Sequence, residues 1–405
     1  MTEETSIAII GAGHAGVQLA ASLREYGFKD EITLIGAEPH LPYQRPPLSK
    51  LSQGTLDLRP QPLRGPAWFQ QQGIALQSGV QVTALEPLAN ALSLSDGRTL
   101  VWKHCVLATG CQPRYLAVAG SELDGVLVLR DLNQALELRR QVRSAKRIVV
   151  IGGGFIGLEV ASIAAALGIQ TTVVESAPRL MARAVSVPVS EHFAKLHRAR
   201  GVHILLGANV KELRGQLAKV SEVVLDDHIV PADLVLLGIG AVAADALASR
   251  SGIDCDGGVL VNSQLETNRT GVFAIGDCAA QWNPWAERRI RIESVQNAVD
   301  HAKKLARHLC GLPSVVEALP WFWSEQGEDK LQIAGLVETA DDFMLKRSDC
   351  AGAFSVLGFK RNQLVCVESV NRPGDHVAAR RILTTGVPTD ADGLRNSPLD
   401  PRTPV

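Results

Sequence analysis

The sequence has no closely spaced pair of cysteines. Its seven cysteines are scattered over 405 residues, with no C-x-x-C pair and no cysteine and histidine cluster of the kind that binds zinc. We therefore expect neither a redox-active disulfide nor a metal site, and we interpret the cysteines as mostly buried, reduced thiols. A G-x-S-x-G motif is also missing, which argues against covalent catalysis by a serine nucleophile.

Long apolar runs and a strong net charge are missing too. The longest weakly polar run, residues 160–174, lies between Glu159 and Glu175 and is too short to cross a bilayer. No cationic stretch precedes an apolar run at the start, so we expect no targeting signal, no membrane association and a cytoplasmic location. The formal net charge of -1 gives no general attraction to nucleic acid.

One pattern occurs twice: a short apolar strand, a glycine-rich turn, a helix and a second strand. The first copy has strands at 6–10 and 31–35, and the second has strands at 147–151 and 170–175. Glycines in such a turn permit a tight bend and close approach of the backbone to a pyrophosphate, which the helix N-terminus attracts. The sequence therefore predicts two dinucleotide-binding units, with these turn residues at the sites: Gly11, Gly13, Ala15, Gly16, Gly152, Gly154, Phe155, Ile156 and Gly157.

A carboxylate at the end of the second strand can accept hydrogen bonds from ribose hydroxyls. Glu175 has this position in the second unit, where it would repel the extra phosphate of NADP by a few kcal/mol. NADH is therefore favoured over NADPH, although Arg183 could partly neutralise the repulsion and Glu175 could be only a solvated strand end. In the first unit, Glu38 offers the nearest carboxylate.

The rest of the chain is organised differently. The length predicts two or three domains. Residues 74–109 and 202–240 are β-rich stretches that resemble meanders, with a hairpin turn at 95–98. After Pro320 come short alternating runs at 331–336, 343–346, 353–359 and 363–370 and a helix near 375–383, which indicate an antiparallel sheet with helices. From residue 386 onward we expect little regular structure.

Gly276 and Asp277 follow a third strand and precede a small-residue turn. Such an aspartate is suited to hold the ribityl hydroxyls of a flavin. An aspartate that only caps a helix is a common alternative, but the two glycine-rich turns upstream favour the flavin interpretation.

Taken together, these motifs resemble those of the oxygenase-coupled, NADH-dependent ferredoxin reductases. The resemblance covers nearly the whole chain and is carried by residues 11–16, 45–50, 107–110, 152–159, 276–278, 291–295 and 320–324. It implies an α/β fold with two Rossmann-like dinucleotide-binding domains, as in glutathione reductase, and a C-terminal α+β domain with an antiparallel sheet. The implied domains are an FAD-binding domain at 1–109 and 241–319, an NAD-binding domain at 110–240 and an interface domain at 320–405.

The resemblance also implies an FAD and an NAD site. Lys50 and Glu159 are the implied catalytic residues, and pairing between them would orient the nicotinamide. Val295 would open a helix whose N-terminal dipole stabilises negative charge on the reduced flavin. Relatives often have an aspartate where this chain has Ala37, which leaves open whether Glu38 makes the usual FAD ribose contact. The further implied cofactor-binding residues are Arg45, Pro46, Val82, Ala108, Thr109, Gly110, Arg130, Gly238, Ile239, Gly240, Ser294 and Trp323.

The implied reaction takes a hydride from NADH onto FAD and passes electrons singly to a 2Fe-2S ferredoxin that serves a cytochrome P450 or Rieske oxygenase. Ferredoxins are usually acidic, so a basic docking surface is expected. The candidates are Arg288, Arg289, Arg291, Lys303, Lys304, Arg307 and Trp323. The alternative for each cation is a solvated charge, and the alternative for Trp323 is core packing. The chain is expected to be a monomer or weak dimer.

Two alternatives remain open from the sequence. One is an NADH oxidase, peroxidase or rubredoxin reductase on the same scaffold, although residues 41–50 contain no reactive cysteine. The other is a redox-sensing flavoprotein of the apoptosis-inducing-factor type, which would keep its reduced complex with the nucleotide instead of turning over. A strongly basic surface would have favoured the sensor, and the net charge does not.

Overall fold

The computed structural model describes residues 2–50, 60–385, 390–395 and 399. The chain divides into two compact units. Unit 1 contains residues 1–44, 60–112 and 242–320, and unit 2 contains residues 45–59, 113–241 and 321–405. The predicted boundaries of three domains stay a prediction.

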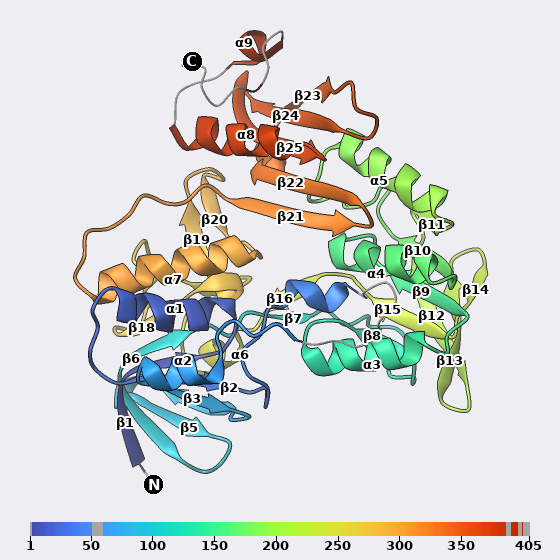
Figure 1. The fold of residues 1–405 in the computed structure, drawn as a ribbon. Coiled ribbons are helices and arrows are strands. Elements are labelled where there is room, and N and C mark those ends of the chain that lie inside the picture. Colours follow the sequence, from blue (N-terminus) through green and yellow to red (C-terminus); the bar gives the residue numbers. More distant parts are fainter. Residues whose placement is uncertain (1, 51–59, 386–389, 396–398, 400–405) are drawn as a thin grey trace. The chain divides into compact units, whose positions relative to one another are not determined.

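Unit 1 is organised around a seven-stranded sheet in the order β3-β2-β1-β6-β5-β4, and β18 pairs with the end of β6, beyond the residues that pair with β5. The strands β1, β2, β3, β6 and β18 are parallel, which buries the apolar runs around Ile7 and Ile9 on both faces. Helices α1 and α7 lie side by side (Figure 1). The bounds of these strands and helices are β1 Thr2–Ile10, α1 His14–Glu25, β2 Ile32–Gly36, β3 Ile74–Ser78, β4 Val82–Glu86, β5 Ala91–Leu94, β6 Thr99–Leu107, β18 Val272–Ala274 and α7 Val295–Leu309.

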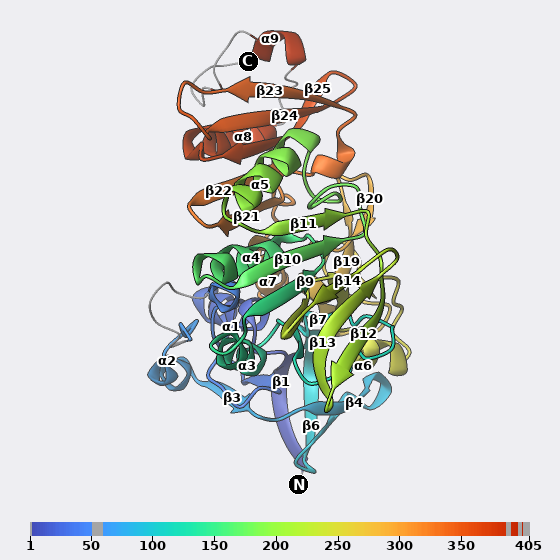
Figure 2. The same cartoon turned by 90° about the vertical axis from the view of Figure 1, so that its right-hand side faces the viewer.

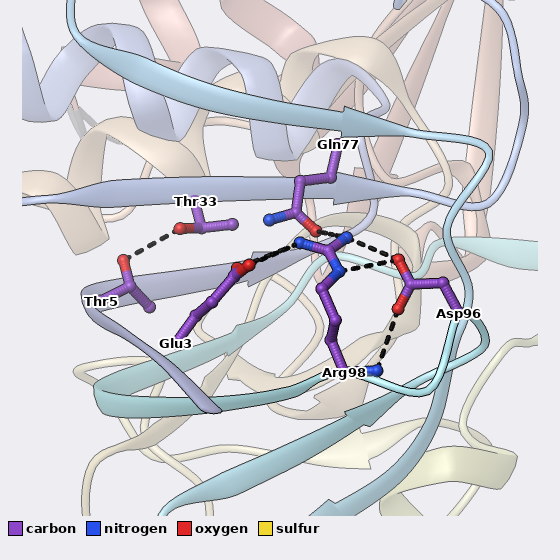
Figure 3. Close-up of polar contacts among 6 residues, drawn as sticks. All are labelled: Glu3, Thr5, Thr33, Gln77, Asp96 and Arg98. Carbon is purple, nitrogen blue, oxygen red and sulfur yellow. Dashed lines mark hydrogen bonds and ion pairs between the residues drawn. The ribbon is translucent and has the colours of Figure 1, made fainter. Parts of the chain in front are cut away.

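The predicted hairpin turn at 95–98 joins the antiparallel strands β5 and β6. Arg98 fixes this turn, because its guanidinium donates to Asp96 in the turn, to Glu3 on β1 and to Gln77 on β3 (Figure 3). Nearby, the buried hydroxyl of Thr33 donates to that of Thr5 at 3.1 Å. Polar side chains thus join four segments of the chain at one end of the sheet.

Smaller elements complete unit 1. The strands β19 and β20 form an antiparallel hairpin beside β17. The bounds are α2 Pro66–Gln71, α6 Ala246–Arg250, β17 Val259–Leu260, β19 Ala279–Asn283 and β20 Arg288–Ile290, with 3-10 turns at Pro87–Ala89 and Gly276–Cys278.

Unit 2 contains a second parallel sheet, β11-β10-β9-β15-β8, and a three-stranded antiparallel sheet, β12-β13-β14 (Figure 2). The apolar strands β9 and β15 lie in the middle and are almost fully buried. The bounds are β8 Val126–Val128, α3 Leu132–Val142, β9 Arg147–Ile151, α4 Phe155–Ala166, β10 Gln170–Glu175, α5 Val187–Ala199, β11 His203–Leu206, β12 Val210–Gln216, β13 Lys219–Leu225, β14 Ile229–Pro231 and β15 Leu234–Leu237. The short strands β7 Cys111–Pro113 and β16 Ala241–Ala243 pair with each other where the chain passes between units.

The C-terminal part of unit 2 is an antiparallel sheet in the order β21-β22-β25-β24-β23 (Figure 1). The alternating runs after Pro320 form strands as predicted, and α8 packs against β22 and β25. The bounds are β21 Trp321–Gln326, β22 Asp329–Gly335, β23 Asp342–Arg347, β24 Phe354–Lys360, β25 Gln363–Val370, α8 Pro373–Thr385 and α9 Ala391–Arg395, with 3-10 turns at Pro46–Ser49 and Val337–Thr339.

Two expectations about local structure hold only in part. The stretches 74–109 and 202–240 are meanders only in part, because β3 pairs with β2 and β11 pairs with β10 in parallel. The segment after residue 386 includes α9, whose Ala391 and Leu394 lie three positions apart and are both buried. The remaining residues of that segment are mostly outside the described ranges. Within the described ranges, no helix is both long and apolar enough to cross a membrane.

Candidate functional site

The first glycine-rich turn leaves open space at the N-terminus of α1. Gly11 has φ +114°, and a Cβ atom there would lie 2.2 Å from the Ala108 carbonyl oxygen, so only glycine fits. Gly16 has the same role against the Gly11 carbonyl oxygen, which brings α1 close to β1. By contrast, a Cβ atom on Gly13 would meet nothing within 4 Å, and the first turn of α1 contains no acidic side chain. These features fit a bound pyrophosphate.

The turn that contains Asp277 lies against the two helices of unit 1. Gly276 has φ +71°, and its α-carbon faces Ala15 on α1 and Ala298 on α7. The Gly276 N–H donates to Nδ1 of His301, which is buried on α7. Burial and the nearby charge of Lys304 lower the pKa of His301 to about 3, so the ring is neutral and accepts this bond. His301, which sequence reasoning missed, therefore holds the turn that presents Asp277.

Helix α7 begins at Val295, as predicted. Ser294 is its N-cap, and the Ser294 hydroxyl accepts a hydrogen bond from the Asn297 N–H at 3.0 Å. The first turn of α7 contains no acidic residue, so its dipole is not neutralised there. This N-terminus is thus suited to negative charge on a flavin ring.

Other predicted FAD residues of unit 1 are placed less conspicuously. The hydroxyl of Thr109 donates to the Ala244 carbonyl oxygen at 2.7 Å, which fixes the segment after β6. Val82 is buried at the start of β4. Glu38 follows β2 and accepts a hydrogen bond from the Tyr43 hydroxyl. Their contacts with FAD stay a prediction.

The second glycine-rich turn repeats the geometry in unit 2. Gly152 has φ +104°, and a Cβ atom there would lie 2.4 Å from the Gly238 carbonyl oxygen. Glu175, at the end of β10, accepts hydrogen bonds from the backbone N–H groups of Gly153 at 2.6 Å and Ala177 at 2.8 Å. Its carboxylate is therefore held at the rim of the turn, where a ribose would lie. The first turn of α4 has no acidic residue, which again fits a pyrophosphate.

Arg183 lies beside another predicted residue of this site. A Cβ atom on Gly240 would be 3.5 Å from a terminal guanidinium nitrogen of Arg183. Since β15 ends just before Gly238, the segment 238–240 and Arg183 share the edge of the sheet at which the parallel strands end. The structure thus brings Glu175, Arg183 and Gly240 to one edge of unit 2.

Lys50 and Glu159 lie close together, but they do not pair. The Lys50 ammonium group forms its ion pair with Glu325 on β21. The buried Glu159 carboxylate instead accepts hydrogen bonds from the hydroxyls of Ser49 and, at 2.7 Å, Ser324. The expected pairing of Lys50 with Glu159 was therefore wrong, because two serine hydroxyls already satisfy Glu159.

The environment of Glu159 affects its protonation. Burial raises the pKa of this carboxyl, and the hydrogen bonds from Ser49 and Ser324 and the charge of Lys50 oppose the shift. Glu159 projects from α4, one helical turn after Phe155. The site therefore contains a carboxyl group next to the second glycine-rich turn whose charge depends on its neighbours.

Further contacts hold the 3-10 turn Pro46–Ser49 in place. Arg45 donates to the Arg130 carbonyl oxygen at 2.8 Å, and the buried Arg139 donates to the Lys50 carbonyl oxygen at 2.7 Å. Phe155 packs against Phe322, with ring centroids 4.6 Å apart. The contacts of Arg45 and Arg139 fix the backbone of residues 45–50.

The partner of Lys50 was missed by sequence reasoning. Glu325 directly follows the aromatic motif at 320–324 that carried the resemblance. Strand alternation indicates only that Glu325 lies on the opposite side of β21 from the buried Ser324 and Gln326, and it does not identify Lys50 as the partner.

The predicted docking cations differ in their exposure and in their contacts. Lys303 is exposed on α7, and Arg288 and Arg289 are exposed on β20, where Arg289 also donates to the Val261 carbonyl oxygen at 2.8 Å. Lys304 is only 14% exposed and forms an ion pair with Glu317. Arg307 donates to the Pro313 carbonyl oxygen and lies over the ring of Tyr26. Lys304 is therefore a poor docking candidate, and Arg307 also has a role within unit 1.

Trp323 lies on β21 in unit 2 and is partly exposed. Its ring contacts that of Trp321, with centroids 5.5 Å apart. The structure thus shows a partly exposed aromatic residue here, while its contacts with a cofactor or partner stay a prediction.

Comparison with known proteins adds the family. Residues 5–302 match the model of the pyridine nucleotide-disulphide oxidoreductase family, and residues 321–403 match that of the reductase C-terminal family. The chain is 42% identical to rhodocoxin reductase of Rhodococcus erythropolis, with 98% of this chain and 93% of that protein aligned.

Two solved structures are similar along almost the whole chain. A ferredoxin reductase from Rhodopseudomonas palustris is 39% identical, with a TM-score of 0.93 and 96% of each chain covered. Putidaredoxin reductase, solved in a covalent complex with putidaredoxin, is 37% identical, with a TM-score of 0.92 and coverage of 98% of this chain and 97% of that chain. The chain therefore belongs to the pyridine nucleotide-disulphide oxidoreductase family, as an FAD- and NAD(H)-dependent oxidoreductase of the ferredoxin reductase group.

Proposed function

We propose that the protein oxidises NADH and delivers the electrons one at a time to a 2Fe-2S ferredoxin, which in turn serves a cytochrome P450 or Rieske oxygenase. The observation that carries this proposal is the presence of two glycine-rich turns at helix N-termini, one in each unit, in a chain whose seven cysteines are all free thiols. A chain with sites for two dinucleotides and no disulfide has no protein group to store an electron pair. Bound FAD supplies the conversion between a two-electron donor and a one-electron acceptor.

The residues of the chain would then bind and orient the two cofactors and supply charge to them. In unit 1, the N-terminus of α1 would hold the FAD pyrophosphate, Asp277 the ribityl hydroxyls, and the N-terminus of α7 the negative charge of the reduced ring. In unit 2, Glu175 would accept hydrogen bonds from a ribose of NADH. Lys50 would supply positive charge beside the flavin, held in place by Glu325.

A small acidic redox protein is the partner that the surface of unit 1 fits. Lys303 is exposed on α7, two turns beyond the helix start that would face the flavin. Arg288 and Arg289 add positive charge on the neighbouring hairpin, and charge complementarity mainly raises the rate of encounter. The relative solved together with putidaredoxin supports a redox-protein partner. We expect this surface of unit 1 to include Lys303, and Trp323 on unit 2 stays a separate candidate.

The test compares electron acceptors. Purified holoenzyme is mixed with NADH and, in separate assays, with an oxidised 2Fe-2S ferredoxin, a rubredoxin or dioxygen. The proposal expects kcat/KM for the ferredoxin to exceed that for rubredoxin by at least about tenfold, with slow oxygen consumption. Equal or faster reduction of rubredoxin would show that rubredoxin, and not a ferredoxin, is the electron acceptor. Rapid oxygen consumption would identify an oxidase.

A further inference from the structure

The segment at 176–186 connects β10 to α5 and carries Arg183. It is an ordered loop, since Arg179 donates to the carbonyl oxygens of Val185 at 2.8 Å and Ala182 at 2.7 Å. Met181 has φ +50°, a conformation that non-glycine residues adopt only when their surroundings hold them. The position of Arg183 therefore depends on how the two ends of this loop are fixed.

The first half of the loop is attached to the second glycine-rich turn. The Met181 N–H donates to the Gly153 carbonyl oxygen at 2.9 Å, and the Ser190 hydroxyl donates to the Leu180 carbonyl oxygen at 2.7 Å. The side chain of Leu180 is fully buried and lies against Gly153. The beginning of the loop thus follows the geometry of the predicted NAD site itself.

The end of the loop is held by a residue from the C-terminal sheet. The Ser186 N–H donates to both carboxylate oxygens of Glu368, at 3.0 and 3.2 Å. Glu368 is fully buried in the middle of β25, between Ile333 and Val356 on the neighbouring strands. Burial raises the pKa of Glu368 to about 7, while hydrogen bonding from Ser186 and the charge of Arg179 oppose the shift.

A buried carboxylate needs a compensating contact, because its transfer from water is costly. Here the contact is the N-terminus of α5, where Ser186 is the N-cap and the helix dipole favours negative charge. Other contacts between α5 and the C-terminal sheet lie farther along the helix. His192 pairs with Asp329 at 2.6 Å, and His197 is hydrogen-bonded to Gln326 at 2.8 Å.

We propose that Glu368 is a positioning residue for the nicotinamide nucleotide. By binding the Ser186 N–H, this carboxylate from the C-terminal sheet fixes the end of the 176–186 loop and so keeps Arg183 beside Gly240. The C-terminal sheet thereby contributes to nucleotide affinity without touching the nucleotide. The inference rests on the proposed function only in taking Arg183 as a contact of NADH.

The test uses FAD-loaded full-length variants. Glu368→Leu removes the acceptor, and Glu368→Gln keeps a carbonyl oxygen that can accept from Ser186. Ser186→Pro removes the donor instead, at a φ of -66° that proline tolerates. We expect Glu368→Leu and Ser186→Pro to raise Kd for NAD+ and KM for NADH by about tenfold, as loss of a hydrogen bond to a charged group does. Glu368→Gln should stay within about threefold, with kcat and FAD content near wild type in all three.

The matched control is Asp329→Asn, which weakens the other end of the same contact between α5 and the sheet. It should lower thermal stability and leave Kd for NAD+ unchanged. A double-mutant cycle tests the route: with Arg183→Ala present, Glu368→Leu should add little further loss. Calorimetric titration with NAD+ measures its Kd, and the ratio of flavin absorbance to protein absorbance measures the FAD content.

The proposal is overturned if Ser186→Pro leaves Kd for NAD+ unchanged, if Asp329→Asn raises it as much as Glu368→Leu, or if the effects of Arg183→Ala and Glu368→Leu are fully additive. Failure of the proposed function would look different, because the wild-type protein would then bind NAD+ normally and yet fail to reduce a ferredoxin.

Discussion

Lys50 is paired with Glu325, a residue 275 positions away on the first strand of the C-terminal sheet. The side chains are 36% and 40% exposed, so the pair contributes no more than about 1 kcal/mol to folding. The main effect of this pair is to orient the Lys50 side chain. Lys50 is thereby kept in one place while the nearby Glu159 is held by serine hydroxyls, which separates the cation and the carboxylate of the site.

The first prediction follows from this pair. Glu325→Gln should slow flavin reduction by NADH severalfold while changing the free energy of unfolding by less than about 1 kcal/mol, because Lys50 becomes mobile but little stability is lost. Anaerobic stopped-flow absorbance measures the reduction rate. Glu328→Gln, an exposed neighbour in the same hairpin, is the control and should behave as wild type. An unchanged reduction rate for Glu325→Gln would mean that Lys50 needs no fixed partner.

The second prediction concerns the charge of Glu159. Ser324→Ala removes a hydrogen bond to the ionised carboxyl and leaves the opposing effect of burial, so the pKa of Glu159 should rise further. If ionised Glu159 is needed for productive NADH binding, the acid limb of the pH profile of kcat/KM should move to higher pH. Glu159→Gln should abolish that limb. An acid limb at the same pH in Ser324→Ala would exclude Glu159 as its origin.

The third prediction concerns coenzyme choice. Glu175→Gln keeps an oxygen that can accept from the Gly153 N–H but removes the charge that would repel the extra phosphate of NADPH. The ratio of kcat/KM for NADPH to that for NADH should rise by about tenfold or more. Arg183→Ala should change the ratio in the opposite direction. If both variants leave the ratio unaltered, the choice is made elsewhere in the site.

Whether a structural feature could be predicted from the sequence depends on how far apart along the chain its contacting residues lie. The bounds of β9 Arg147–Ile151, β10 Gln170–Glu175 and β25 Gln363–Val370 were predicted correctly, because the apolar runs end at glycine, asparagine or charged residues. The glycine-rich turns were predicted as well, since each is local in sequence. Contacts between distant segments were not: Lys50 with Glu325 and Glu368 with Ser186 depend on how separate sheets pack, and no local pattern encodes that.

The fourth prediction uses the buried His301. Its pKa is lowered from 6.5 to about 3, so the folded state binds fewer protons than the unfolded state between these values. The stability that neutral His301 contributes is present above pH 6.5 and is lost as the pH falls toward 3, by at most about 1.4 kcal/mol per pH unit. The urea concentration at the unfolding midpoint should therefore decrease less between pH 7 and pH 5 in His301→Gln than in the wild type. Flavin fluorescence monitors the unfolding. The exposed His203→Gln is the control, and equal slopes in all three proteins would contradict the account.

The fifth prediction concerns docking. Lys303→Glu should lower the rate of ferredoxin reduction at low salt by about tenfold and leave flavin reduction by NADH unchanged, since an exposed charge acts on encounter. The difference should shrink at high salt. Lys29→Glu is the matched control, because it also reverses the charge of an exposed lysine. Lys29 precedes β2 and so lies at the opposite edge of the sheet from the glycine-rich turn. Ferredoxin kinetics that are unchanged by Lys303→Glu at low salt would remove Lys303 from the docking surface.

The central claim is electron transfer from NADH to a one-electron iron–sulfur protein. It is tested most directly by anaerobic stopped-flow absorbance of the purified yellow protein, mixed first with NADH and then with an oxidised 2Fe-2S ferredoxin. The account predicts rapid flavin bleaching by NADH, followed by reoxidation of the flavin as two ferredoxins are reduced. A long-lived reduced complex with the nucleotide that does not react with the ferredoxin would contradict the account and indicate a redox sensor.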